Sequence, residues 1–129
     1  MLLTLVFLPL GSYTLYNAFC LYANYVKASK LGLPLVVVPI TPDNPLWFAL
    51  QTAFGGALRY VPFELFSFTR HCRTGWEFHD RYKTHDQLGD AWVLVTPARI
   101  WLYVANAAAV TDIFGRGKDF TRPVWMLGI

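Results

Sequence analysis

Four side chains that can bind a metal ion lie close together in the sequence: His71, Cys72, His79 and His85. Imidazole nitrogens and thiolate sulfurs are the donors that zinc takes, and Cys72 and His79 are spaced to lie near one face of a helix. His85 falls in the loop that follows, and no acidic ligand completes a tetrahedral set. We therefore predict no metal site here and interpret these residues as surface and helix-packing groups.

A second candidate is "GRGK" at residues 115–118, which is similar to a phosphate-binding loop only in part. That loop requires a glycine five residues before its last glycine and a Ser or Thr after its lysine, and this chain has Asp112 and Asp119 there. A nucleophile elbow is also missing, so Ser-His-Asp chemistry has no support. From the residues alone we predict no catalytic, cofactor-binding or metal-binding side chains.

The composition favours membrane contact. Of the 129 residues, 55% are hydrophobic and only 15% are charged, which is too apolar for an ordinary soluble domain. The net charge of +3 comes from scattered Lys and Arg residues, so nucleic-acid binding is not predicted. Cys20 and Cys72 form no disulfide framework, and we expect free, buried thiols.

Residues 1–26 carry no charged side chain, and about 20 apolar residues suffice to cross the roughly 30 Å hydrocarbon core of a bilayer. A cleaved secretory signal is the competing interpretation, but such a signal begins with basic residues and is shorter. We favour an uncleaved, single-pass anchor. Lys27 and Lys30 follow directly, so the positive-inside rule predicts that the bulk of the chain is cytosolic.

Residues 27–45 form a basic flank and a proline-rich hinge. Its prolines exclude a helix and a central strand, which predicts an extended connector pressed against protein or lipid, with a plain linker as the alternative. Residues 46–60 are nearly uncharged but contain Gly55, Gly56 and Arg59. They are too interrupted for a second crossing, and we predict a short helix on the membrane surface.

The following region predicts one helix and one hairpin. Apolar residues in 63–83 recur at helical spacing, at Leu65, Phe68, Cys72 and Trp76. Residues 91–95 and 100–104 are β-branched and aromatic runs joined by a turn, and neither alternates with polar residues, so both faces of this hairpin need cover. Asn106 is the predicted cap of a short helix that Gly115 closes.

About 70 residues follow the surface helix, which is marginal for an independent domain. One amphipathic helix covers one face of a two-stranded hairpin, leaving the second face and the strand edges open. We therefore predict an α+β fragment, the start of a larger fold.

The order of anchor, hinge, amphipathic helix, hairpin and short helix resembles the N-terminal quarter of a haem-thiolate monooxygenase of the cytochrome P450 superfamily, closest to microsomal fungal members. The resemblance rests on "GLPLVVVPITPDNPLW", "FHDRYKTHDQLGDAWVLVTP", "LYVANAAAVTDIFGRGKDFTRP" and "WML". It implies that residues 46–129 are the incomplete N-terminal part of a catalytic domain. It also implies location at the endoplasmic reticulum membrane, a haem cofactor in the full-length enzyme, oxidation of an apolar substrate with O2, and an NADPH-dependent reductase as partner.

The chain departs from the family's catalytic signatures. Neither Glu64 nor Glu77 has an Arg three residues on, and neither cysteine lies in the family's Phe-x-x-Gly-x-x-x-Cys-x-Gly setting. We therefore expect this chain alone to bind no haem and to be non-catalytic. The basic residues Arg116, Lys118 and Arg122 are expected to be a solvated rim.

By analogy with the family, the loop over the substrate pocket begins at Phe120, Pro123, Trp125 and Met126, although these side chains are equally interpreted as ordinary core residues. Two other functions stay open. One is a small membrane-anchored interaction protein whose cytosolic part completes its sheet on a partner. The other is a small secreted protein after signal cleavage.

Overall fold

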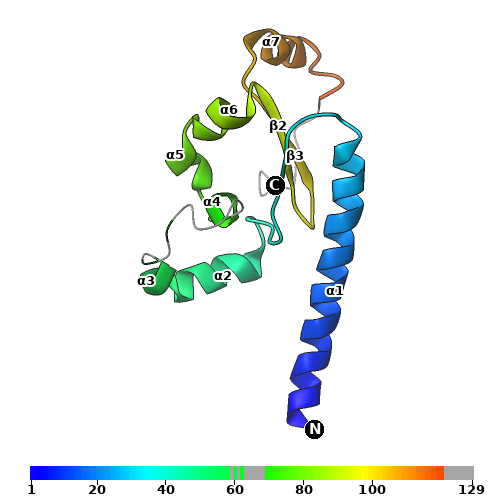
Figure 1. Ribbon diagram of the computed structural model, residues 1–129, viewed down its shortest axis with the longest axis vertical. Coiled ribbons are helices and arrows are strands. Elements are labelled where there is room, and N and C mark those ends of the chain that lie inside the picture. The colour runs from blue at the N-terminus through cyan, green and yellow to red at the C-terminus, as the bar shows by residue number, and fades with distance from the viewer. Residues whose placement is uncertain (59, 61, 63–68, 121–129) are drawn as a thin grey trace.

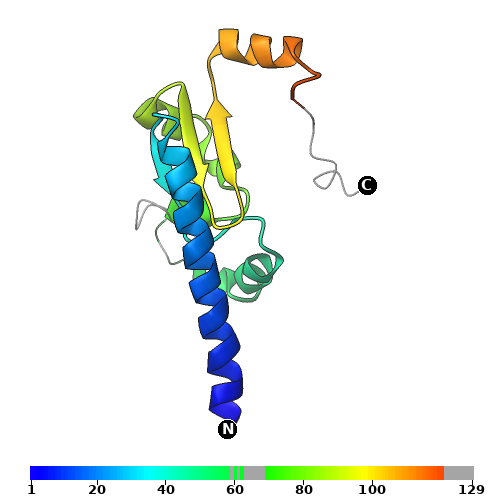
Figure 2. The same ribbon diagram turned by 90° about the vertical axis from the view of Figure 1, so that its right-hand side faces the viewer.

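The computed structural model describes residues 1–58, 60, 62 and 69–120. A long N-terminal helix stands beside a small sheet, and short helices cover the sheet's other side (Figures 1 and 2). The elements in chain order are α1 Leu2–Ser29, β1 Leu35–Val37, α2 Pro45–Ala53, α3 Gly55–Leu58, α4 Thr69–Cys72, α5 Trp76–Asp80, α6 Lys83–Leu88, β2 Ala91–Val95, β3 Ile100–Val104 and α7 Ala107–Gly115.

The predicted hairpin is confirmed as β2 and β3, which pair antiparallel with Val95 opposite Ile100. The prediction of only two strands is wrong, because β1 pairs parallel with β2 and makes a three-stranded sheet of order β1-β2-β3. β1 lies between prolines at the sheet edge, where a strand can end without disrupting an inner ladder. The backbone N–H of Val38 continues the pairing by donating to the carbonyl of Val95 at 2.9 Å.

Both faces of β2 are covered, as its unbroken apolar sequence predicts. Trp92 and Leu94 pack in one buried cluster with Val38, Cys72 and Trp76. Val93 and Val95 pack in another, with Ala28 of α1. The expectation that the second face stays open is wrong, because the end of the predicted anchor covers it (Figure 2).

The predicted single helix over 63–83 is wrong in its described part, which forms α4, α5 and the start of α6 instead. The chain turns at Gly75 and Arg81, whose φ angles of 74° and 55° lie in the left-handed region and break the helix. Cys72 and Trp76 still share one buried cluster, as their spacing predicts. Leu65 and Phe68 lie outside the described residues.

The short helices enclose a buried polar network. Arg70 is buried and pairs with Asp80 at 3.1 Å. Thr84 donates to both carboxylate oxygens of Asp80, from its hydroxyl at 2.7 Å and from its backbone N–H at 3.1 Å. The ring Nε2 of His71 lies 3.2 Å from the same hydroxyl. The partners compensate for burying the two charges.

α2 and α7 each begin with an asparagine cap. The side chain of Asn106 accepts from the backbone N–H groups of Ala108 and Ala109, so the predicted cap of α7 is confirmed. Asn44 caps α2 in the same way, with Pro45 at the first helical position. The predicted helix over 46–60 is therefore present as α2 and α3, which are separated at Phe54.

Candidate membrane-facing cleft

α1 has two parts that differ in their surroundings. The helix from Leu3 to Ser29 is, within the described chain, the one that is long and apolar enough to cross a membrane. Large apolar side chains in its first half are exposed, for example Leu8 at 74%. Its last turns pack on the sheet through Leu21 and Ala28. An exposed apolar half joined to a docked half is what an anchor fixed rigidly to a domain requires.

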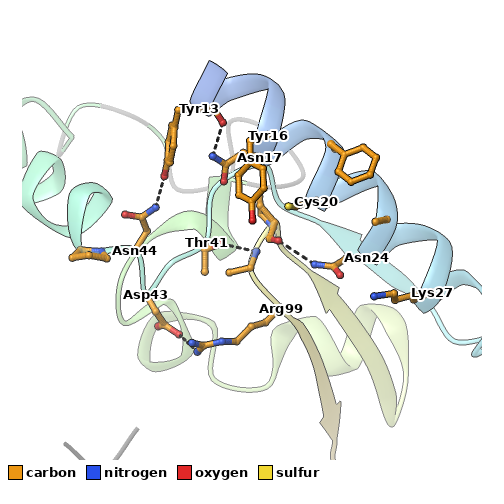
Figure 3. Close-up of a pocket in the computed structure, with 15 residues that line it drawn as sticks. Tyr13, Tyr16, Asn17, Cys20, Asn24, Lys27, Thr41, Asp43, Asn44 and Arg99 are labelled. Carbon is orange, nitrogen blue, oxygen red and sulfur yellow. Dashed lines mark hydrogen bonds and ion pairs between the residues drawn. The ribbon is translucent and has the colours of Figure 1, made fainter. Parts of the chain in front are cut away.

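Asn24 fastens α1 to the hairpin turn. Its side-chain amide donates to the carbonyls of Thr96 and Pro97, at 2.9 and 3.1 Å. The same turn is held from the other side by Thr41 of the proline-rich segment, whose buried hydroxyl accepts from the N–H of Ala98 at 3.3 Å. Helix, hinge and hairpin are thus joined at one point (Figure 3).

A cleft of about 610 Å³ lies between α1, the proline-rich segment and the hairpin turn (Figure 3). Three charged side chains line it: Lys27, Asp43 and Arg99, with Arg99 3.8 Å from Asp43. At the other end of the cleft, the Asn44 amide donates to the Tyr13 hydroxyl at 2.9 Å. This bond holds the start of α2 beside the middle of α1.

The cleft continues into apolar surface toward the N-terminus of α1. A smaller hollow of about 310 Å³ lies between α1 and α2 and shares Tyr13, Asn17, Thr41 and Asn44 with the cleft. A third hollow follows, lined by Leu5, Val6, Pro9, Leu10, Tyr13 and Leu46. The polarity of this surface therefore changes along α1, from charged near Lys27 to apolar near Leu5.

Of the four predicted site residues, the structure describes Phe120 alone. Phe120 follows α7 and is 50% exposed, and it is not among the lining residues. The other three, Pro123, Trp125 and Met126, lie outside the described residues, as does Arg122 of the predicted rim. Arg116 and Lys118 are exposed, as expected for a solvated rim.

The four metal-binding candidates also separate. His71 and Cys72 are buried, whereas His79 is exposed and His85 stacks on Tyr82 with ring centroids 5.3 Å apart. The described residues hold no group of three or more His, Cys, Asp or Glu side chains arranged for a metal ion.

Neither cysteine fits the thiolate ligand of a haem. Burial raises the pKa of the Cys72 thiol from 9.0 to about 11, only partly offset by a hydrogen bond with the backbone of Ile40, so this sulfur is protonated near neutral pH. It lies among Val38, Trp76 and Trp92 inside the core. Cys20 lies within the α1 helix and lines the cleft, whereas the family presents its cysteine from a glycine-flanked loop. Both cysteines are free, as predicted, but the prediction that both are buried is wrong for Cys20, which is half-buried where it faces the cleft.

Sequence reasoning missed Asn24, Thr41 and Asn44, which organise the cleft. A signal for Asn24 was present, because an amide in an otherwise apolar run is costly in lipid and normally has a protein partner. Thr41 and Asn44 carried no comparable signal, since polar residues are common in proline-rich connectors.

A small α+β body fastened to an exposed apolar helix is the arrangement of a membrane-tethered domain. Comparison with curated proteins adds the family. The chain is 30% identical over 135 residues to a cytochrome P450 monooxygenase of Penicillium roqueforti, a match that covers 90% of this chain and 22% of the relative. A cytochrome P450 monooxygenase of Penicillium rubens is 28% identical over 90% of this chain and 22% of the relative. One of Arthrobotrys oligospora is 25% identical over 81% of this chain and 17% of the relative.

These matches show that the chain is related to the cytochrome P450 monooxygenases, as its sequence features predict. The chain spans about a fifth of the length of the curated relatives it matches. No protein-family model matches it, and no solved structure gives a significant match.

Proposed function

We propose that the chain is the N-terminal, membrane-anchoring portion of a cytochrome P450 monooxygenase. In full length the enzyme would oxidise an apolar substrate with haem and O2, and would receive electrons from an NADPH-dependent reductase. This portion tethers and orients the enzyme and is not catalytic alone. The observation that carries the proposal is the relation to P450 monooxygenases together with an exposed apolar helix docked on a sheet.

The charges of the described residues suggest the level of the membrane surface. Asp43 and Arg99 line the cleft beside the second half of α1, and charged groups avoid hydrocarbon. The part of α1 left for the hydrocarbon then runs from Leu2 to about Asn17. At a rise of 1.5 Å per residue it is about 25 Å long, near the lower limit for a span.

The position of α2 agrees with this proposed level of the membrane surface. α2 lies beside Leu10, Tyr13 and Asn17 of α1, and the chain from Asn44 to Leu58 has no charged residue. Its exposed side chains include Leu46, Phe48 and Phe54. We propose that α2 enters the cytosolic leaflet and acts as a second membrane contact, with the endoplasmic reticulum as the membrane.

A lysine scan of α1 in microsomes tests the tether. Lysine near the middle of a span is expected to cost about 3 kcal/mol of insertion free energy and lysine outside it almost nothing. Leu8→Lys should therefore reduce the carbonate-resistant fraction of the full chain by about a hundredfold, and Phe19→Lys should change it little. If the span instead reaches residue 26, Phe19→Lys also reduces this fraction. Equal extraction of the unmodified chain and Leu8→Lys would overturn the anchor.

The haem expectation has its own test. The purified chain, incubated with haem, reduced and exposed to carbon monoxide, is expected to lack the absorption band of a thiolate-ligated haem. The appearance of that band would overturn a non-catalytic role. A transcript whose reading frame continues past Ile129 into the cysteine loop would support the enzyme assignment directly.

One observation favours the alternative of a membrane-anchored interaction protein. Within the described residues β3 pairs on one side only, and Leu102 of that strand is 55% exposed. An unpaired apolar edge can add a strand from a partner. A monodisperse chain that unfolds cooperatively alone in detergent would favour this function over a fragment of a larger domain.

A further inference from the structure

One continuous surface channel follows α1 from the charged cleft to the apolar hollow near its N-terminus. The three hollows overlap at Tyr13, and the two apolar ones share Leu10 and Leu46. We call this surface, from Lys27 to Leu5, the α1 groove. The two residues that mark its ends are 22 positions apart, or about 33 Å along the helix axis.

We infer that the α1 groove binds one anionic phospholipid, with the phosphate headgroup at its charged end and an acyl chain along its apolar end. This inference rests on the proposed membrane tether, since that tether brings the groove to the level where headgroups meet hydrocarbon. A free phosphate ion would use the charged end only and would leave the apolar end without a ligand.

The charged end matches a phosphate. Two cations, Lys27 and Arg99, line it against one carboxylate, Asp43, so the net charge of these lining groups is positive. Lys27 lies ten residues above Asn17, and helical side chains lean toward the N-terminus, which directs its amine down toward the membrane. In Figure 3, Lys27 and Asn24 extend from α1 on the side of the hairpin turn.

The apolar end matches an acyl chain. Leu5, Pro9 and Leu10 of α1 face Leu46 of α2 across it. Leu5 and Leu46 are 71% and 58% exposed, so the groove is open along its side to a lipid in the surrounding bilayer. The bond between Tyr13 and Asn44 holds α1 and α2 together where the polar part meets the apolar part.

The test uses the full chain in detergent micelles that contain a phosphatidylserine analogue with a photoactivatable group in its acyl chain. Cross-linked residues are mapped by mass spectrometry. We expect cross-links at Leu5, Pro9 and Leu46 in excess over Leu3, which does not line the groove. Cross-links spread evenly around α1 would overturn the inference, because they would indicate ordinary boundary lipid.

Two matched variants test the headgroup contact. Lys27→Gln is expected to weaken retention of the lipid about fivefold, the factor for one basic residue near an anionic lipid surface. Lys30→Gln removes the same charge three residues away, and Lys30 does not line the groove. Equal loss in both variants would indicate general attraction and would overturn the site.

Leu10→Trp, which fills the apolar end, should reduce cross-linking while leaving α1 helical. Millimolar inorganic phosphate serves as competitor, and full displacement of the lipid by phosphate would show an anion site instead of a lipid site. The cross-linking assay is done in micelles and the lysine scan in microsomes. A negative cross-linking result would therefore overturn the lipid site while the lysine scan could still support the membrane tether.

Discussion

The two faces of strand β2 are both fully buried, but by different means. On one face, Trp92 and Leu94 pack in a cluster with Trp76 of the short helices, and the Trp92 ring stacks on Tyr103 of β3 at a centroid distance of 4.5 Å. Val93 and Val95 on the other face pack against α1, chiefly against the buried Ala28, with Leu21 beside it. We call these the aromatic face and the anchor face.

The difference reflects what each face packs against. Short helices separated by turns leave irregular space, which large aromatic side chains fill. The continuous helix α1 instead presents the small side chain of Ala28 at its buried contact with Val93 and Val95. The aromatic face therefore builds the body of the domain, and the anchor face fixes the direction in which α1 leaves it.

The largest effect should come from the aromatic face. Trp92→Ala removes the ring that contacts His71, Trp76, His85 and Tyr103. Truncation of a buried Trp costs about 3–5 kcal/mol in the free energy of unfolding. Denaturant unfolding of the full chain in micelles, followed by near-ultraviolet circular dichroism, measures the loss. Phe78→Ala is the control, because Phe78 is 86% exposed, and a similar loss there would contradict the packing.

A second large effect is expected for the polar network behind the aromatic face. Arg70→Met leaves Asp80 buried without its cation and should cost about 3 kcal/mol in the free energy of unfolding. This expected cost is at the low end of the usual range for a broken buried ion pair, because Thr84 still donates to both carboxylate oxygens of Asp80. Adding Asp80→Leu to Arg70→Met should recover part of the loss in the same unfolding assay. A double variant as unstable as the sum of both single variants would show that the pair is not coupled.

The anchor face should respond to added volume. Ala28 is fully buried against Val93 and Val95, so Ala28→Leu must displace α1 or the sheet. Overpacking of this kind costs about 1–3 kcal/mol in the free energy of unfolding. Ser29→Leu adds similar volume at an exposed neighbour and is expected to change stability by less than about 0.5 kcal/mol. If both variants unfold alike, α1 is not docked through Ala28.

A smaller, local effect is expected at the hairpin turn. Asn24→Leu removes two hydrogen bonds to the carbonyls of Thr96 and Pro97 and should cost about 1–2 kcal/mol. Amide exchange at Ala98 and Arg99 should accelerate, because the turn loses its link to α1. Asn17→Leu is the matched control, since its amide donates within α1 to the carbonyl of Tyr13. Unchanged exchange in Asn24→Leu would contradict the link.

Elements that depend on neighbouring residues were easier to predict from the sequence than elements that depend on distant partners. The hairpin and the cap of α7 depend on neighbouring residues, and their predicted bounds agree with the structure. β1 was missed because it has three residues between prolines and its register, Leu35 opposite Val93, depends on a partner 58 positions away. The helix break at Gly75 carried a visible signal, since glycine takes a positive φ without strain. The helix break at Arg81 had no such signal in the sequence.

The cleft was less predictable than the fold. Residues 1–26 were interpreted as membrane anchor throughout, because periodicity cannot separate lipid-facing from sheet-facing apolar residues. The division of the chain into an anchor (1–26), a hinge (27–45) and the start of a catalytic domain (46–129) stays a prediction. Only the docking of Leu21 and Ala28 reveals that the last turns of this helix belong to a protein core, whereas its first half is exposed.

The last prediction concerns the ionisation of Cys72 and Tyr103. It changes the free energy of unfolding least near neutral pH, and it separates the two faces because both groups lie on one of them. Burial raises the pKa of Cys72 from 9.0 to about 11 and also raises that of Tyr103, with the negative charge of Glu77 adding to the shift. Both groups belong to the aromatic face. A raised pKa of an acidic group means that the folded state disfavours the charged form. Its stabilisation is therefore complete below pH 9 and is lost as pH rises from 9 toward 11.

The stability of the full chain should thus fall over this interval, and Cys72→Ala should flatten the fall by removing one of the two titrating groups. Unfolding midpoints measured at pH 8.5, 9.5 and 10.5 give the comparison. Cys20→Ala is the control, because Cys20 lies on α1, outside both buried clusters. A fall in stability that is identical in Cys72→Ala and the unmodified chain would mean that Cys72 does not contribute to the alkaline titration, and Tyr103 would then be the first residue to test.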